Sequence, residues 1–145
     1  MSFSRGQPIA VLASDPDSAD QHALIAALQQ RFHITVASTL RETDHYLRQG
    51  LFNILLLELD QTDGDGLEYI RYVHRDPQLH TTIIACVTRH ASIHDKAIAF
   101  QAGADDYIVK PINPLTFAGR VGLLTRLSRL STWRNVPTEP DPPQR

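Results

Sequence analysis

The sequence predicts an α/β fold, a doubly wound parallel sheet of five strands with helices on both faces. Short apolar runs alternate with longer amphipathic stretches over the first 130 residues, as expected when helices connect parallel strands by right-handed crossovers. The run at 54–57 (ILLL) is apolar on both faces, which is typical of a strand covered by helices on both sides. Hydrophobic residues make up 42% of the chain, enough for one core.

The first strand and the first helix are indicated near the N-terminus. Residues 9–13 (IAVLA) form an apolar run, and Asp15-Pro16 follows it. Asp is a favourable N-cap and Pro suits the first helical turn, so we expect the helix to begin at this pair. Leu24 and Leu28 give this helix an apolar face.

The next elements follow the same alternation. Residues 33–37 alternate as a second strand, and Thr39 with Glu42 has the spacing of a capping box that begins a helix. Gly50 is expected to end that helix. Residues 52–59 are predicted as the third strand.

The second half of the domain begins with a turn rich in Asp and Gly at 61–66. The helix after it is expected to end near Asp76, which precedes a proline. Residues 82–87 form a fourth apolar run, and a helix over about 92–102 is predicted with Gly103 as its cap.

The last strand and helix complete a domain that we place at residues 1–130. The strand is expected at 107–109, and a helix begins at Asn113-Pro114 and continues to about residue 127 or beyond. Residues 131–145 contain four prolines and little apolar character, so they are predicted to be a Pro-rich disordered tail or linker.

Charge and composition exclude several classes of protein. Fourteen basic and sixteen acidic residues leave a net charge of −2, so we expect neither direct nucleic-acid binding nor membrane binding driven by bulk charge. The single Cys86 rules out an internal disulfide and a cysteine metal site. No apolar run approaches the ~20 residues of a membrane span, and no signal peptide is expected before Asp15. A cytoplasmic protein is therefore predicted.

Polar side chains gather where the predicted strands end. In an open α/β sheet, sites form at the carboxyl ends of the strands. A carboxylate, a hydroxyl and an ammonium at one edge are suited to a phosphoryl group. The residues at this edge are Ala13, Ser14, Asp15, Glu58, Leu59, Asp60, Thr88, Arg89, Lys110 and Pro111.

Three segments stand out in the sequence: FNILLLELDQTDGDGLEYIR, CVTRHAS and AGADDYIVKP. Read together, they resemble the receiver domain of two-component response regulators over about residues 8–128. Glu58 is 8 residues before Gly66 and 30 before Thr88, and Thr88 is 22 before Lys110, all as in that family. The resemblance implies the flavodoxin-like strand order 2-1-3-4-5.

The resemblance also implies roles for particular positions. In the family, an Asp after the third strand takes a phosphoryl group from a histidine kinase, and two acidic residues after the first strand help to hold Mg²⁺. A Thr or Ser and a Lys grip the phosphoryl oxygens, and an aromatic residue in the fifth strand turns inward. The equivalent positions here are Glu58 (phosphoacceptor), Ala13 and Ser14 (acidic pair), and Thr88, Tyr107 and Lys110 (phosphate binding and switch).

Three of these positions depart from the family pattern. Glu58 replaces the acceptor Asp, and choosing Asp60 instead would shorten the spacings to Gly66 and Thr88 to 6 and 28. Ala13 and Ser14 offer no carboxylate, so Mg²⁺ binding is expected to be weak or absent. We therefore predict a non-catalytic pseudo-receiver without a cofactor, held in one signalling state by a Glu58–Lys110 pair.

Other interpretations stay open at this point. A Mg²⁺-dependent phosphoacceptor with a rearranged site would use Glu58 or Asp60, with Asp15 as a ligand. Glu58 alone is also explained as a leftover polar residue, Thr88 as a helix-entry residue, and Tyr107 as a surface aromatic. A nucleotide-binding protein has little support, because no Gly-rich loop follows the first strand.

The expected partners are proteins. They are an output domain or separate partner, a histidine kinase, and a second copy of the chain in a homodimer. The candidate dimer face is built from the fourth helix, fifth strand and fifth helix, and it carries Lys96, Asp105, Asp106 and Arg120. Charges of both signs would cross-pair in a symmetric dimer, although the same residues are equally typical of a solvated surface.

Overall fold

The fold is a parallel sheet of five strands between two layers of helices, which confirms the predicted class and strand order. The structure is a computed structural model that describes residues 9–129. The sheet order is β2-β1-β3-β4-β5, and every pairing is parallel. The strands are β1 (Ile9–Ser14), β2 (Phe32–Ala37), β3 (Ile54–Leu57), β4 (Ile83–Thr88) and β5 (Asp106–Val109). The helices are α1 (Ser18–Leu28), α2 (Leu40–Arg48), α3 (Gly66–Arg75), α4 (Ile93–Ala102) and α5 (Pro114–Arg129).

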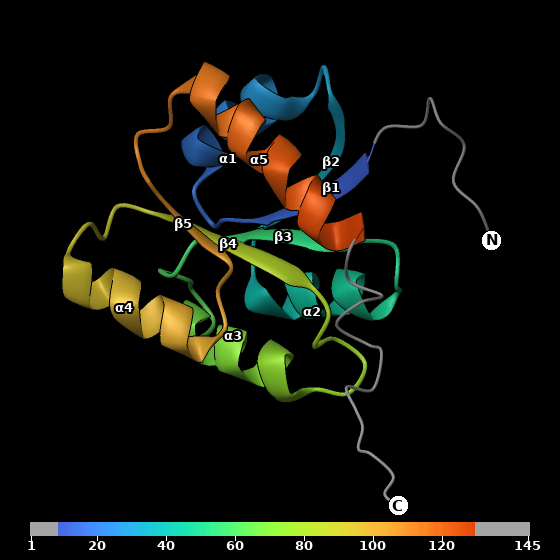
Figure 1. The fold of residues 1–145 in the computed structure, drawn as a ribbon, viewed down its shortest axis with the longest axis vertical. Coiled ribbons are helices and arrows are strands. Elements are labelled where there is room, and N and C mark those ends of the chain that lie inside the picture. Colours follow the sequence, from blue (N-terminus) through green and yellow to red (C-terminus); the bar gives the residue numbers. More distant parts are fainter. Residues whose placement is uncertain (1–8, 130–145) are drawn as a thin grey trace, which may run out of the picture.

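The helices divide between the two faces of the sheet. α1 and α5 cover one face, and α2, α3 and α4 cover the other (Figure 1). Successive side chains of a strand point to opposite faces, so neighbouring residues enter different cores. Leu55 and Leu57 pack under the three-helix layer, whereas Ile54 and Leu56 pack under α1 and α5. This double burial explains why the third strand has no polar alternation.

The start of α1 differs from the expectation that Asp15-Pro16 would open it. The N-cap is Asp17, whose side chain accepts a hydrogen bond from the backbone N–H of Asp20 at 2.9 Å. Asp15 instead turns toward Lys110, with a 2.7 Å contact. A buried ion pair outweighs a cap that Asp17 can supply equally well two residues later.

The predicted capping residues of the other helices are largely confirmed. Thr39 accepts from the N–H of Glu42 at 3.0 Å, and Gly103 ends α4 with a φ of 128°, in the range that favours glycine. β3 is shorter than predicted, because only Ile54–Leu57 pairs on both sides. Asp63, in the β3–α3 loop, accepts the first two amides of α2 and so ties that loop to the helix.

Cys86 lies in the middle of β4 and is fully buried. Burial raises the pKa of its thiol to about 12, so it is an inert core residue. Within residues 9–129, no helix is long and apolar enough to cross a membrane. The tail predicted at 131–145 lies outside the described residues.

Candidate functional site

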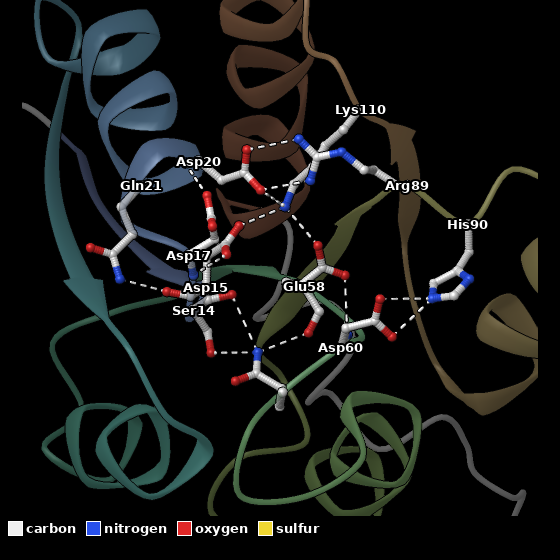
Figure 2. Close-up of polar contacts among 11 residues, drawn as sticks. Ser14, Asp15, Asp17, Asp20, Gln21, Glu58, Asp60, Arg89, His90 and Lys110 are labelled. Carbon is white, nitrogen blue, oxygen red and sulfur yellow. Dashed lines mark hydrogen bonds and ion pairs between the residues drawn. The ribbon is translucent and has the colours of Figure 1, made fainter.

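The site lies at the carboxyl ends of β1, β3, β4 and β5, where the sequence placed it. Asp15 follows β1, Glu58 follows β3, and Lys110 follows β5, while Thr88 is the last residue of β4. These strands are neighbours in the sheet, so their ends lie close together. Asp15 and Lys110 therefore meet although they are 95 residues apart in the sequence. The side chains of Asp15, Glu58 and Lys110 converge on one centre (Figure 2).

That centre is the ammonium group of Lys110. Its Nζ lies 2.6 Å from Glu58 Oε1, 2.7 Å from Asp15 Oδ2 and 2.9 Å from Asp20 Oδ2. An ammonium has three N–H donors, and each has a carboxylate partner here. The side chain of Lys110 is 4% exposed, so the cluster is largely shielded from water and salt.

The remaining carboxylate oxygens are also engaged. Asp15 Oδ1 accepts from the N–H of Asp17 at 2.9 Å, and Glu58 Oε2 accepts from the N–H of Asp60 at 3.1 Å. Both oxygens of Asp20 accept from the guanidinium of Arg89, at 2.8 and 3.0 Å. Every oxygen of the three central carboxylates therefore has a hydrogen-bond donor.

The charges in the cluster support one another. Hydrogen bonds from Arg89 and then Lys110 lower the pKa of Asp20 to about 2, against the effect of burial. Burial raises the pKa of Asp15, and its bond with Lys110 reduces that rise. Burial opposes the charge on Lys110, but its bonds with Asp15, Glu58 and Asp20 prevail and raise its pKa. Lys110 therefore stays protonated across the physiological range.

Thr88 is fully buried at the site, yet it does not join the cluster. Its Oγ1 has no hydrogen-bond partner among the described residues. Leaving a buried hydroxyl unpaired costs about 1–3 kcal/mol. The helix-entry interpretation is not supported, since Thr88 is the last residue of β4 and Ser92 caps α4.

Tyr107 is buried, contrary to the interpretation of a surface aromatic. Its hydroxyl donates to the backbone carbonyl of His90 at 2.7 Å, and burial raises its pKa to about 12. The His90 ring in turn contacts both oxygens of Asp60 at 2.9 Å, and this hydrogen bond raises the pKa of His90. The ring of Tyr107 is thus turned inward and held by the β4–α4 loop.

The two positions equivalent to the acidic pair lie at the end of β1. Ala13 is buried in the core under α1 and α5. The Ser14 Oγ lies 2.7 Å from Thr43 Oγ1 in α2. Neither residue supplies a carboxylate, and the adjacent Asp15 provides the one that reaches the site from β1.

Three of the four residues of the candidate dimer face have partners within the chain. The guanidinium of Arg120 in α5 lies 2.6 Å from the carboxylate of Asp106, the first residue of β5. Asp105 accepts from the N–H of Ile84 at 2.9 Å, which places it at the start of β4. Lys96 lies half-buried on α4.

Sequence reasoning missed two residues of the site, Asp20 and Gln61. Asp20 lies in the first turn of α1, where an acidic residue is ordinarily read as favourable to the helix dipole. Gln61 donates from its amide to Ser14 and to the carbonyl of Glu58. Sequence spacing carries no signal for either contact, because both depend on the packing of separate loops.

The donor chemistry of the cluster resembles that of a divalent-cation site, but its arrangement does not. One oxygen each from Asp15, Asp20 and Glu58 lie within 4.8 Å of one another, and carboxylates are the ligands that Mg²⁺ prefers. The ammonium of Lys110 contacts all three residues. An ion bound to all three would have to displace that group, so the residues as placed do not fit a resident Mg²⁺.

Comparisons with known proteins agree with the fold. The family model of the response regulator receiver domain matches residues 11–121. The virulence transcriptional regulatory protein PhoP of Salmonella typhimurium is 31% identical over 118 residues, which cover 80% of this chain and 51% of that protein. The chain spans about half the length, or less, of the curated relatives it matches.

Solved structures support the same architecture. A CheY-like response regulator receiver domain protein from Methanospirillum hungatei superposes with a TM-score of 0.76 at 23% identity, over 85% of this chain and 98% of that chain. The chemotaxis protein CheY4 of Vibrio cholerae gives 0.73 at 24% identity, over 83% and 99%. At this level of identity, the likeness concerns the fold.

Proposed function

Since this chain belongs to the family of response regulator receiver domains of two-component signal transduction, we propose that it is an atypical member, a pseudo-receiver that acts by protein–protein contact without phosphorylation. It is not an enzyme in this proposal, and it needs no metal cofactor. Glu58 stands in the phosphoacceptor position, and its carboxylate takes the role of a permanent negative charge facing Lys110.

One observation carries the proposal, the saturation of Lys110 by carboxylates of the chain itself. The family uses this Lys to neutralise charge on the phosphoryl group. Here Glu58, Asp15 and Asp20 already contact its Nζ at 2.6–2.9 Å. An incoming phosphoryl group would bring further negative charge to three buried or half-buried carboxylates and would have to break a pair to find a cation.

The inward Tyr107 supports a fixed signalling state. In the family, the switch aromatic turns inward with the Thr. Tyr107 has that orientation, with its hydroxyl bonded to the His90 carbonyl. The β4–α4 loop is held further by the His90–Asp60 pair. Tyr107 and the β4–α4 loop thus have these contacts without a phosphoryl group, whereas the Thr88 Oγ1 has no partner among the described residues.

The proposed partner is an output domain or a separate protein. The curated relative PhoP is named a transcriptional regulatory protein, and we propose that this chain regulates such an output by contact, in the cytoplasm, without binding nucleic acid itself. A homodimer through α4, β5 and α5 is part of the proposal. Formation of that dimer would let Arg120 and Asp106, paired within the chain at 2.6 Å, exchange partners across the two-fold axis. A histidine kinase would then be a binding partner rather than a phosphoryl donor.

An NMR titration tests the proposal. Amide spectra are recorded with Mg²⁺ to millimolar concentration and then with beryllofluoride, a phosphoryl mimic. We expect no saturable shifts at Glu58, Thr88 or Lys110 while the spectrum of the folded protein persists. Saturable shifts at these residues would show a competent pocket and refute the proposal.

A charge-removing variant tests the fixed state. Glu58→Gln keeps the size of the side chain but leaves Lys110 with two carboxylates. We expect the amide signals of Tyr107 and His90 to shift or broaden, together with a change in partner binding. Unchanged signals and unchanged binding would show that the Glu58–Lys110 pair does not set the state.

A second candidate function, the Mg²⁺-dependent phosphoacceptor, has one observation in its favour. Asp15, Asp20 and Glu58 bring carboxylate oxygens within 4.8 Å, and a site rearranged around Asp15 would then supply the ligands. Saturable Mg²⁺ shifts in the wild type that disappear in Asp15→Asn would favour this candidate. It requires Lys110 to leave the centre of the cluster.

A further inference from the structure

Gln61 makes contacts that the pseudo-receiver proposal does not use. Its side-chain Nε2 donates to the backbone carbonyl of Glu58 at 2.8 Å and to the Ser14 Oγ at 3.1 Å, and it lies 3.4 Å from the Ser14 carbonyl. Three oxygen atoms from the ends of β1 and β3 therefore converge on one nitrogen.

The direction of this amide is determined by chemistry. All three neighbouring oxygens can accept hydrogen bonds, so a flipped amide would place Oε1 against acceptors. In the observed direction, Oε1 is buried and has no partner among the described residues. A buried unpaired acceptor costs about 1–3 kcal/mol, so the side chain is held in place by its donors.

Several oxygens gathered around one centre form the arrangement in which a hard cation is bound, and here the N–H groups of an amide take that central position. The family resemblance places Mg²⁺ beside the acidic pair after β1 and the backbone that follows the phosphoacceptor. Ser14 occupies the second position of that pair, and the amide of Gln61 lies between Ser14 and the carbonyl of Glu58. The neutral amide of Gln61, with its two N–H donors, thus occupies the side of that place that Ser14 lines.

We propose that Gln61 is a built-in substitute for the divalent ion, a positioning residue whose amide joins the ends of β1 and β3 and closes that place to metal. This inference rests on the proposed function and goes beyond it. Lys110, the cation that the family itself places here, neutralises the carboxylates. Gln61 engages the neutral oxygens instead, so the two side chains act on different atoms of the site.

Gln61→Glu tests the inference directly, because it exchanges the donor for a carboxylate of the same size. Without a cation, that carboxylate faces the oxygens of Ser14 and Glu58 and is repelled. With Mg²⁺ or Mn²⁺ it becomes a ligand. We expect the melting temperature of this variant to fall below that of the wild type and to rise again with either ion alone.

Two further measurements make the test specific. Mn²⁺ should broaden the amide signals of Ser14 and Glu58 in the variant and leave the wild type unaffected. Gln61→Ala, which removes the donor without supplying a ligand, should show weaker Mn²⁺ broadening of the Ser14 signal than Gln61→Glu, and the wild type should show none.

Gln21 provides a matched control on the other side of the site. It is also half-buried, and its Nε2 donates to the Asp15 carbonyl at 2.6 Å and to the Ser38 Oγ at 2.9 Å. Gln21→Glu should be destabilised without recovery on addition of metal. An equal rise in melting temperature on addition of metal in both variants would show only a non-specific effect of the added negative charge. That result would refute the role of Gln61.

The outcomes separate this inference from the function on which it rests. Saturable Mg²⁺ binding by the wild type would refute the pseudo-receiver proposal itself. A wild type that binds no metal, together with a folded Gln61→Glu variant that also binds none, would overturn the role of Gln61 and leave the pseudo-receiver proposal standing.

Discussion

Lys110→Met removes the cation of the buried cluster and keeps a side chain of similar length. The wild-type Nζ has contacts of 2.6, 2.7 and 2.9 Å with Glu58, Asp15 and Asp20. Met has no donor for any of them. The variant therefore isolates the contribution of the ammonium from the packing of the stem, which a shorter residue would also remove.

The size of the effect follows from the geometry. Two unit negative charges 4.8 Å apart, the outer limit for the ligand atoms of this cluster, repel by about 3.5 kcal/mol at an effective dielectric constant near 20. Arg89 still neutralises Asp20 from the solvent side, and protonation relieves part of the remainder. Removing one partner of a buried ion pair costs roughly 3–5 kcal/mol, and we expect this variant to lose that amount at pH 7.

Urea denaturation followed by circular dichroism measures this loss, with Glu58→Gln as the control. That control leaves Lys110 paired with Asp15 and Asp20, so it should lose much less stability than Lys110→Met. In a thermal scan, the loss in Lys110→Met corresponds to a fall in melting temperature of roughly 10–20 °C.

The pH dependence provides an internal check. Burial already raises the pKa of Asp15 in the wild type, and loss of Lys110 raises it further. A group whose pKa is higher in the folded state stabilises the protein below its unfolded pKa, and that contribution is lost as the pH rises through the folded value. The deficit of Lys110→Met should therefore shrink from pH 7 to pH 5. A loss below about 1 kcal/mol at pH 7, or a deficit that grows on acidification, would refute the reasoning.

Three further predictions concern the edge of the site. Gly66→Ala should lower the free energy of unfolding, measured by urea denaturation, by about 1–3 kcal/mol, because its Cβ would lie 2.7 Å from the Cα of Leu59. An unchanged stability would show that the β3–α3 loop shifts at no cost. The pKa of His90 measured by NMR should lie above the usual 6.5 and return toward that value in Asp60→Asn. The His90–Asp60 pair should therefore stabilise the β4–α4 loop at low pH, and this stabilisation should be lost as the pH rises through the folded-state pKa of His90. Tyr107→Phe should cost about 1 kcal/mol, with amide shifts confined to the β4–α4 loop, and a larger loss spread over the sheet would contradict the single hydrogen bond to His90.

The sequence predicted the fold and the main site because both depend on short-range patterns. Buried runs define the strands, and in an open sheet their carboxyl ends must meet at one edge. Glu58, Thr88 and Lys110 come directly at or after three such ends, so their meeting follows from topology. The fixed spacing from Glu58 to Gly66 also has a physical reason, since any side chain at Gly66 would strike the backbone of residues 58 and 59.

The contacts that escaped prediction belong to a different class. The sequence places Asp15 at the edge of the site but also predicts that it helps to begin the first helix, and only the position of Lys110, 95 residues away, decides that its side chain turns inward. Asp20 has the pattern of a solvated helix residue until the first turn of α1 is placed beside Lys110, which follows β5. Side-chain direction in such cases follows from the assembled packing, which the local pattern does not contain.

The single buried thiol of Cys86 can be used to measure local opening of the sheet. It lies in β4 opposite Tyr107 of β5 and is fully shielded from water. With one cysteine in the chain, an alkylating reagent has a single target, which it reaches when β4 and the helices over it separate. The rate of labelling therefore measures how often the β4–β5 part of the sheet opens locally. This rate can be compared directly between the wild type and each variant of the charged cluster.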